Sequence, residues 1–454
     1  MLATLASFPA SLSVLASIGL PGLKSLPIFE DEINVSSQDG SEDPELPRSG
    51  MLLVLPAPFY KTEGKLVFEL QACNGIEKWA DHFGKVIVVA PMLPDRIAEK
   101  ERTIVWRDTA TLAQPERFEL VPVPWAYSIK LFTKHYASTR KLLAGLINRC
   151  RYLQFPLGGL FGDWGAVASL EAQRQHRPYA VHTDLVEDQV VLQLAQGKNW
   201  KSQLKSSLFS LITKKYYKGI IQNSSLALLH GEDCHAAYSS LCKKSFLVHD
   251  THTKPEDAIS HEALAKKFQA LAIDRPLRIC YAGRMTPMKA PLDWVRAIGE
   301  ARDLGAEVEA TWLGDGVLRE EVQQLIVELG LEDCIELVGY ESDRQKVLQR
   351  IQSAHLMLFT HITSESPRCL IEAFVSGTAI VGYHSRYAED LTQDGGGALV
   401  SVHDWQQLGK LLQDLWRDRP RLTKLVEQAA AKRTRFNDEA VFQERSQLIK
   451  LYLS

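Results

Sequence analysis

Two basic residues in one short loop indicate a site for a diphosphate. The segment YAGRMTPMKAPLDWVRAI (281–298) has the pattern of a strand end, a loop and a helix start. Gly283 allows a ligand to approach the backbone, and Arg284 and Lys289 supply two positive charges that can clamp a diphosphate across the loop. The alternative, a strand-to-helix turn with two solvated cations, stays open on this motif alone.

A second group of charged residues lies at the start of a later helix. In TSESPRCLIEAFVSGTAIVGY (363–383), Pro367 and the apolar run after it predict a helix. Arg368 falls in its first turn, between Glu365 and Glu372. Free N–H groups and the helix dipole make that end positive, so a cation there is unfavourable unless an anion offsets it. Either an anion docks between the helix start and Arg368, or Arg368 points into water.

These side chains need a scaffold, and the sequence predicts one of alternating strands and helices. Apolar runs such as KVIVVAP (85–91) and VEATWLG (308–314) alternate with amphipathic segments of helical length, one of them from Gly64 to Phe83. Such alternation predicts parallel sheets with helices on both faces. A chain of 454 residues is too long for one ordinary core. We therefore expect an α/β protein of two doubly wound domains, with a ligand between the carboxyl ends of their strands.

Composition divides the chain into four expected parts. Residues 1–48 combine an apolar, Ser-rich start with an acidic stretch and read as a tail and linker. The first Rossmann-like domain is expected at 49–260 and the second at 275–436, joined through a polar, proline-containing connection over 251–276. Residues 437–454 are expected to form a terminal helix that crosses back to the first domain.

Charge and cysteine content exclude several classes of protein. A net charge of −3 gives no global reason to bind nucleic acid, and paired lysines such as Lys266 and Lys267 are typical of solvated helix surface. Seven scattered cysteines without a CxxC pair argue for a reducing cytosol and against a structural zinc. The HDTH run (249–252) has no second cluster at ligand spacing, so no metal site is predicted.

The N-terminal segment does not have the pattern of a signal peptide or a membrane span. It carries no cation before Lys24, and Pro9 and Pro21 interrupt its apolar residues. We expect a cytoplasmic protein with a tail that is either disordered or in peripheral contact with a membrane.

The order of four motifs resembles the family 4 glycosyltransferases. These motifs are GRxxxxK (283–289), LGDG (313–316), LGLEDCIELVGY (329–340) and ESPRCLIEAFVSGTAIVGY (365–383). The resemblance, which is strongest over about 277–402, implies a GT-B fold, in which two Rossmann-like domains face each other across a cleft. It also implies transfer with retention of anomeric configuration.

The resemblance implies roles for individual residues. Arg284 and Lys289 would hold the donor diphosphate, Glu372 would accept from the ribose hydroxyls, and Glu365 would contact the transferred sugar. The family leaves seven residues between the two glutamates, whereas six separate them here, so strict spacing falls on Ser364. The expected catalytic residues are Arg284, Lys289 and Glu365, and the expected donor site comprises Gly283, Arg284, Lys289, Gly314, Ser364, Glu365, Arg368 and Glu372.

The first domain offers weaker candidates for the acceptor side. Gly64 stands where the family has a Gly-rich turn, and His182 and Asp184 follow a predicted strand. The glycine-rich stretch PLGGLFGDWG (156–165) either lines an acceptor pocket or is an ordinary strand-to-helix loop.

The function implied by the resemblance is transfer of a sugar from a nucleotide-sugar donor to an acceptor hydroxyl. Glycan, lipid-linked glycan and small metabolite all stay open as acceptors. The nucleotide sugar is a substrate, no cofactor is expected and no divalent metal is strictly required. The alternatives are a sugar-nucleotide epimerase of the same fold and a non-catalytic protein that binds nucleotide sugars.

Overall fold

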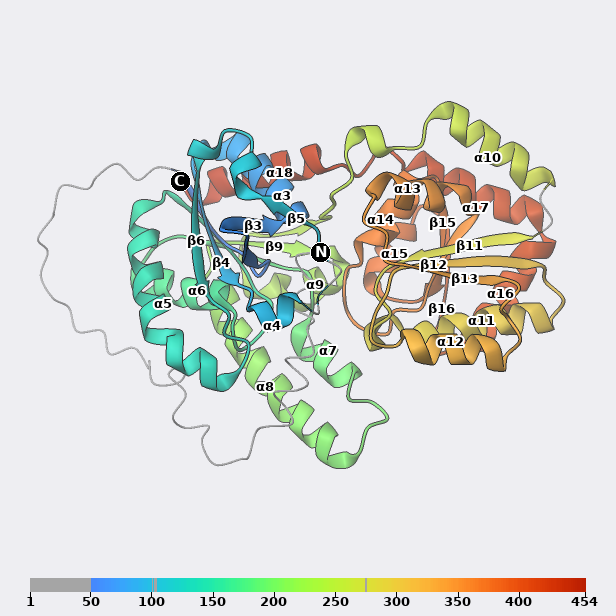
Figure 1. The fold of residues 1–454 in the computed structure, drawn as a ribbon, viewed down its shortest axis with the longest axis horizontal. Coiled ribbons are helices and arrows are strands. Elements are labelled where there is room, and N and C mark those ends of the chain that lie inside the picture. Colours follow the sequence, from blue (N-terminus) through green and yellow to red (C-terminus); the bar gives the residue numbers. More distant parts are fainter. Residues whose placement is uncertain (1–49, 100, 102–103, 274–275) are drawn as a thin grey trace, which may run out of the picture.

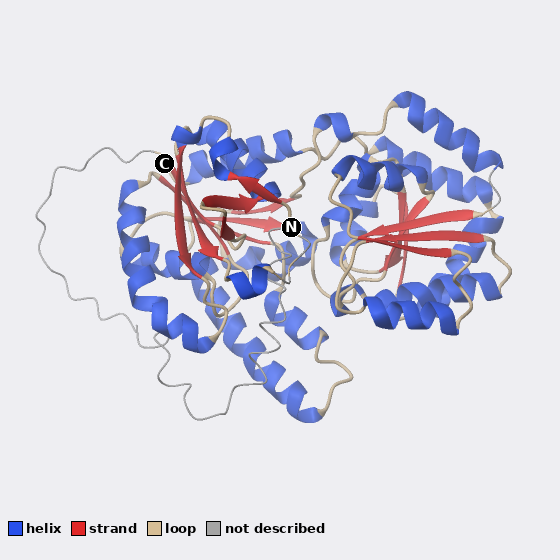
Figure 2. Cartoon of the chain, in the orientation of Figure 1, coloured by secondary structure: helices blue, strands red, loops and turns tan. Residues whose placement is uncertain are grey.

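The computed structural model describes residues 50–99, 101, 104–273 and 276–454. Two α/β bodies lie next to each other, each with a sheet between layers of helices (Figure 1). The sheets stand out as the red arrows of Figure 2, enclosed by blue helices. This arrangement confirms the predicted pair of Rossmann-like domains. The expected tail (1–48) lies outside the described residues.

Within the described residues the first sheet has ten strands: nine follow the order β10-β9-β8-β7-β1-β4-β2-β3-β5, and β6 pairs with β4 beside this path. β1 pairs in parallel with both β4 and β7, whereas β2 and β3 form an antiparallel hairpin. The ten strands are β1 (Met51–Val54), β2 (Phe59–Thr62), β3 (Lys65–Glu69), β4 (Val86–Met92), β5 (Trp106–Asp108), β6 (Phe118–Pro124), β7 (Tyr152–Pro156), β8 (Ala180–Thr183), β9 (Leu226–His230) and β10 (Ser245–Val248).

The second sheet has six strands in the order β13-β12-β11-β14-β15-β16, all of them parallel. β14 and β15 are buried along their whole length, as their continuous apolar sequences require when helices cover both faces. The strands are β11 (Leu277–Ala282), β12 (Val308–Leu313), β13 (Ile335–Gly339), β14 (Leu356–Phe359), β15 (Ala379–Tyr383) and β16 (Gly397–Val400).

Helices cover the faces of both sheets. Those of the first domain are α3 (Leu70–Phe83), α4 (Asp95–Ala98), α5 (Ile129–Arg149), α6 (Trp164–Arg174), α7 (Glu187–Gln193), α8 (Trp200–Gln222) and α9 (Gly231–Tyr238). The remaining helices are α10 (His261–Ile273), α11 (Pro291–Asp303), α12 (Arg319–Glu328), α13 (Arg344–Ser353), α14 (Arg368–Val375), α15 (Arg386–Thr392), α16 (Trp405–Arg417), α17 (Arg419–Ala431) and α18 (Asp438–Tyr452).

The last helix, α18, packs on the first domain although it follows the second in sequence. In Figure 1 it lies beside α3, away from the body that precedes it. Phe442 meets Trp79 of α3 edge-to-face with 5.0 Å between ring centroids, and Ile449 is fully buried in the same core. This packing brings side chains of α18 to the strand ends of the first sheet.

Several segments differ from the expected elements. Residues 59–69 form the β2–β3 hairpin, and helix α3 begins only at Leu70, where the Glu69 carboxylate caps it by accepting from the Ala72 N–H at 2.7 Å. The connection expected at 251–276 contains helix α10. Helices α7 and α8 occupy 187–222, where no element was expected.

Candidate active site

The loop after β11 carries the first of the two expected cations in a confined position. Gly283 is required there, because a Cβ at this position would lie 2.7 Å from the Tyr281 hydroxyl oxygen. Burial lowers the pKa of the Arg284 guanidinium, and the carboxylates of Glu101 and Glu365 partly oppose this shift. Arg284 is therefore a largely desolvated cation that lies within the field of Glu365.

The second cation, Lys289, is paired with the first glutamate of the motif. Its ammonium lies 2.6 Å from Oε2 of Glu365, and both side chains are nine-tenths buried or nearly so. The hydroxyl of Thr363 donates to the other oxygen of Glu365 at 3.2 Å. Thr360 at the end of β14 donates to the Lys289 carbonyl at 2.8 Å, which ties the two loops together. The shorter glutamate spacing therefore still brings Glu365 to Lys289.

Behind this pair lies a buried histidine that sequence reasoning missed. Nε2 of His361 is 2.7 Å from the Tyr281 hydroxyl, and Nδ1 is 3.5 Å from Oε1 of Glu365. Burial, with a further contribution from the charge of Lys289, lowers the pKa of His361 well below its usual range. The ring is thus neutral at pH 7, so its approach to Glu365 is not an ion pair, and within the described residues Nδ1 has no hydrogen-bond partner.

The second glutamate of the motif has a different partner. Oε1 of Glu372 accepts from Arg344 at 2.9 Å, and the same guanidinium approaches Asp257 at 3.4 Å. Arg344 comes from α13 and was not identified from the sequence. Glu365 and Glu372 therefore each face a cation of their own, Lys289 in one case and Arg344 in the other.

Arg368 does not point into water, so that alternative is wrong. Its guanidinium lies 3.6 Å from Oδ2 of Asp250, at the end of β10 in the first domain. Among the described residues neither terminal nitrogen has a hydrogen-bond partner, because that distance is within reach of an ion pair but too long for a hydrogen bond. Burial lowers the pKa of Arg368 to about 10. The anion that faces this helix start is a carboxylate of the protein itself.

Asp250 is also held by two groups of the first domain. Arg445 of α18 donates to Oδ1 at 2.6 Å, and Nε2 of His182 lies 3.4 Å from Oδ2. Burial alone would raise the pKa of Asp250, but Arg445 and His182 outweigh burial and hold it well below its usual range. Asp250 is consequently ionised at all physiological pH values.

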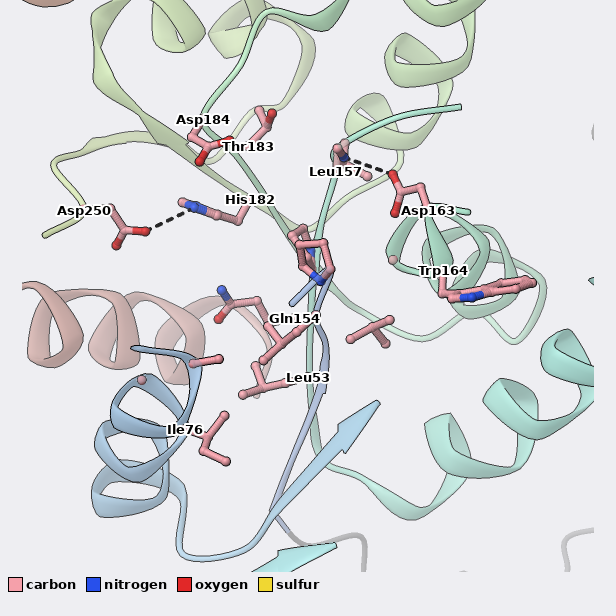
Figure 3. A pocket seen from close by; sticks show the side chains of 18 of the residues that line it. Leu53, Ile76, Gln154, Leu157, Asp163, Trp164, His182, Thr183, Asp184 and Asp250 are labelled. Carbon is pink, nitrogen blue, oxygen red and sulfur yellow. Dashed lines mark hydrogen bonds and ion pairs between the residues drawn. The ribbon is translucent and has the colours of Figure 1, made fainter. Parts of the chain in front are cut away.

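A pocket at the carboxyl ends of the first sheet contains both His182 and Asp184. Figure 3 shows these two residues with Asp250 on one side, and Asp163 and Trp164 on the other. Burial raises the pKa of Asp184 to about 6, and the charges of Asp250 and Glu365 act in the same direction. Other lining residues include Leu53, Gln154, Leu157, Gly158, Gly162, Thr183, His252 and Phe442. The stretch 156–165 thus contributes to this pocket.

The loop that carries Glu365 is docked on the first domain through Ser364. The Ser364 hydroxyl accepts from Gln193 at 3.0 Å and donates to Gln189 at 3.1 Å. Its backbone N–H donates to Gln193 Oε1 at 2.9 Å, and its carbonyl accepts from Val186. The next residue but one, Ser366, donates to the His230 carbonyl at 2.7 Å. Ser364 therefore holds the domains together in this conformation.

At the two remaining glycine candidates, Gly314 and Gly64, the local backbone explains why glycine is present. Gly314 adopts φ +138°, and a Cβ there would lie 2.1 Å from the Gly283 carbonyl oxygen, so it permits two loops to pack. Gly64 forms the tight turn of the β2–β3 hairpin with Glu63, and both residues have positive φ. Gly64 is not among the residues that line the pocket. Its expected role on the acceptor side stays a prediction.

A metal-binding cluster and a membrane-spanning helix are both absent from the described part of the chain. Within it, no group of three or more His, Cys, Asp or Glu side chains is placed to hold a metal ion. Within the same residues, no helix combines the length and the apolar character needed to cross a membrane.

Comparison with solved structures identifies the fold as GT-B. Anabaena Alr3699/HepE in complex with UDP superposes with a TM-score of 0.60 at 15% identity, covering 88% of this chain and 100% of that one. WaaG, a glycosyltransferase involved in lipopolysaccharide biosynthesis, superposes with a TM-score of 0.59 at 13% identity, covering 88% and 99%. At these identities the likeness establishes the fold alone.

Sequence comparison finds similarity over the second domain. Residues 264–432 match the family described as glycosyl transferases group 1. The amylovoran biosynthesis glycosyltransferase AmsK of Erwinia amylovora is 26% identical over 187 residues, which is 39% of this chain and 46% of that protein. The putative colanic acid biosynthesis glycosyltransferase WcaL of Escherichia coli K12 is 26% identical over 184 residues, or 38% and 45%. The chain thus spans about half the length of these curated relatives.

Proposed function

We propose that this protein is a glycosyltransferase that moves a sugar from a nucleoside diphosphate to an acceptor hydroxyl. The observation that carries the proposal is the grouping of Arg284, Lys289 and Glu365 where the second domain meets the first. Two cations suit a diphosphate, and a carboxylate suits a pair of sugar hydroxyls because both of its oxygens accept. Asp184 of the first domain, which lies within the field of Glu365, supplies a carboxylate on the acceptor side.

The proposed mechanism places the positive charges on the leaving group. Expulsion of the diphosphate from the anomeric carbon builds negative charge on its oxygens, and Arg284 and Lys289 stabilise that charge. Glu365, held by Lys289 and Thr363, accepts from hydroxyls of the transferred sugar. We propose retention of configuration, with attack on the face from which the diphosphate leaves and with a diphosphate oxygen taking the acceptor proton. This scheme requires no divalent metal or cofactor.

The names of related proteins guide the choice of substrates. Because HepE was solved with UDP and with UDP-glucose, UDP-glucose is the first donor to test. The relatives named for amylovoran and colanic acid biosynthesis support a saccharide acceptor, free or lipid-linked. We propose a cytoplasmic site of action, where nucleotide sugars are made.

The test is donor-dependent release of nucleoside diphosphate, measured after a thermal-shift screen of UDP-, GDP- and ADP-sugars has found a donor. Lys289→Ala should lower turnover on the order of 10²-fold. Lys266→Ala is the matched control, because Lys266 also pairs with a glutamate at 2.7 Å but on an exposed helix face. Near-normal turnover in folded Lys289→Ala would refute the donor site. Donor conversion without any acceptor would indicate an epimerase, and binding without turnover a non-catalytic protein.

A further inference from the structure

Helix α8 exposes a row of large apolar side chains. Trp200, Leu204, Leu208 and Leu211 have exposed fractions of 69%, 62%, 40% and 65%. Their spacing of four, four and three residues places them on one face of the helix. We call these four residues the apolar stripe. Isolated exposed apolar residues are common on protein surfaces, but four on one helical face form a continuous patch.

The apolar stripe lies on the solvent-facing side of α8, so its side chains do not pack in the protein core. The buried residues of the same helix include Ser206, Ser210 and Thr213, three to four residues apart on the opposite face. In this half of α8, Ser206, Phe209 and Ser210 are buried, whereas the three leucines of the stripe are exposed. Apolar side chains of a soluble domain normally pack on the core, so a row of outward leucines calls for a partner.

The charges around the stripe specify what kind of partner fits. Helix α8 contains five lysines and no acidic residue, although the whole chain has a net charge of −3. The ammonium of Lys201 lies 5.7 Å from the centre of the Trp200 ring. Lys205 and Lys215 are also exposed on this helix. An apolar face with Trp and Leu, on a helix whose only charged residues are lysines, matches a surface that is apolar inside and anionic at its boundary.

The position of α8 leaves this face accessible. Figure 1 shows α7 and α8 extending from the lower side of the first domain, with the loop between them farthest from the body. The same pair of helices reaches the second domain, because Gln189 and Gln193 of α7 bond to Ser364 beside Glu365. A surface bound by α8 therefore lies next to the helix pair that contacts the donor loop.

We propose that the apolar stripe and the lysines of α8 dock the protein on the surface of an anionic lipid bilayer. Trp200 and the three leucines enter the boundary between headgroups and acyl chains, while the lysines pair with lipid phosphates. A second copy of this chain fits less well, because lysine rows of two α8 helices would face each other. The docking is independent of the sugar-transfer reaction, and it assigns membrane contact to the first domain rather than to the tail.

The test is flotation of the full chain with vesicles of phosphatidylglycerol and phosphatidylcholine, compared with phosphatidylcholine alone. The full chain should bind the anionic vesicles at least tenfold better than the neutral ones, and less well as salt is raised. Leu204→Gln/Leu208→Gln/Leu211→Gln should reduce partitioning at least tenfold. The matched control is Val317→Gln/Val327→Gln, which alters residues 73% and 55% exposed on the second domain.

Further measurements separate lipid docking by α8 from the alternatives. A variant lacking residues 1–45 should keep most of its binding, and loss of all binding would assign the contact to the tail and overturn the proposal. Trp200→Phe should remove most of the fluorescence quenching caused by brominated lipids, so unchanged quenching would also overturn it. Sedimentation that shows a dimer broken by the leucine substitutions would identify the stripe as an interface between copies. Unchanged UDP affinity and thermal midpoint in the leucine variant separate lost docking from misfolding and from failure of the donor site.

Discussion

Glu365→Gln is expected to strengthen binding of free UDP while it slows sugar transfer. In the structure the Glu365 carboxylate forms an ion pair with the Lys289 ammonium at 2.6 Å, and its charge also attracts the Arg284 guanidinium. An incoming diphosphate therefore meets two cations whose charge is already partly neutralised. Removing the negative charge leaves both cations to the diphosphate. The hydroxyl contacts of Glu365 are to the transferred sugar, so their loss affects the intact donor and not UDP.

The expected gain in UDP affinity depends on how deeply the Lys289–Glu365 ion pair is buried. Two unit charges about 5 Å apart repel by about 3 kcal/mol at an effective dielectric constant of 20, and by under 1 kcal/mol in water. The side chains of Lys289 and Glu365 are 12% and 10% exposed, so an intermediate value applies. A gain of about 1 to 2 kcal/mol corresponds to a Kd for UDP that is about 5- to 30-fold lower. Turnover with UDP-glucose should fall on the order of 10²-fold.

The assay is calorimetric titration with UDP and with UDP-glucose at low and high salt. Glu262→Gln is the matched control, because its carboxylate pairs with Lys266 at 2.7 Å on an exposed surface and should change neither affinity. Weaker UDP binding in Glu365→Gln, comparable to that in Lys289→Ala, would refute the reasoning. That result would mean that Glu365 organises Lys289 for the diphosphate rather than competing with it.

Three other perturbations test the surrounding structure. Asp184→Asn should abolish a fall in kcat/KM below about pH 6, visible in a pH–rate profile, because burial raises the pKa of Asp184 to about 6. Urea unfolding should show stability rising by up to about 1.4 kcal/mol per pH unit above pH 7, and Lys267→Met should flatten the rise. The reason is that burial lowers the pKa of folded Lys267 to about 7, so the unfolded state binds more protons. Gly231→Ala should lower the thermal midpoint, because its Cβ would lie 2.2 Å from Ser366 Oγ at φ +75°.

The central parallel strands were predictable where an apolar run is buried on both faces of its sheet. Segment 85–91 is such a run and forms β4 as expected, and segment 308–314, in which Glu309 is exposed, forms β12. The 59–69 hairpin was not anticipated, because its pairing depends on a turn in which Glu63 and Gly64 both take positive φ. Short strands with exposed residues carry little periodic signal.

In helix α8 and at Lys267, the burial seen in the structure differs from the burial that the sequence pattern predicts. Leu204, Leu208 and Leu211 of α8 are exposed while Ser206 and Ser210 are buried, so the pattern does not indicate a core-facing helix. The pair Lys266 and Lys267 is typical of solvated surface, yet Lys267 is buried and donates to the Thr378 hydroxyl at 2.7 Å. A sequence pattern predicts the average burial of a residue type. Whether these particular residues are buried depends on which segment packs against them.

Within the candidate site, the motif residues were predictable but their partners were not. The loop and helix motifs identified Lys289 and Glu365, and the structure places the two side chains together. Arg344, which pairs with Glu372, comes from helix α13. That pairing depends on how the helices pack in three dimensions, which no local spacing encodes. His361 lies only four residues before Glu365, but the sequence does not show that its ring is buried against the Tyr281 hydroxyl.

Arg368 gives the clearest case, because its unfavourable position in the first turn of α14 is explained only across the domain boundary. Asp250 is kept ionised and fixed in the first domain by Arg445, which donates to it at 2.6 Å. A buried carboxylate with one cation can still attract another, and Arg368 supplies it at 3.6 Å. The positive charge of Arg368, which is unfavourable at the start of α14, thus stabilises the contact between the two domains. Any movement of the second domain away from the first must separate Arg368 from Asp250 and Ser364 from α7 together, so the two contacts should open as one step.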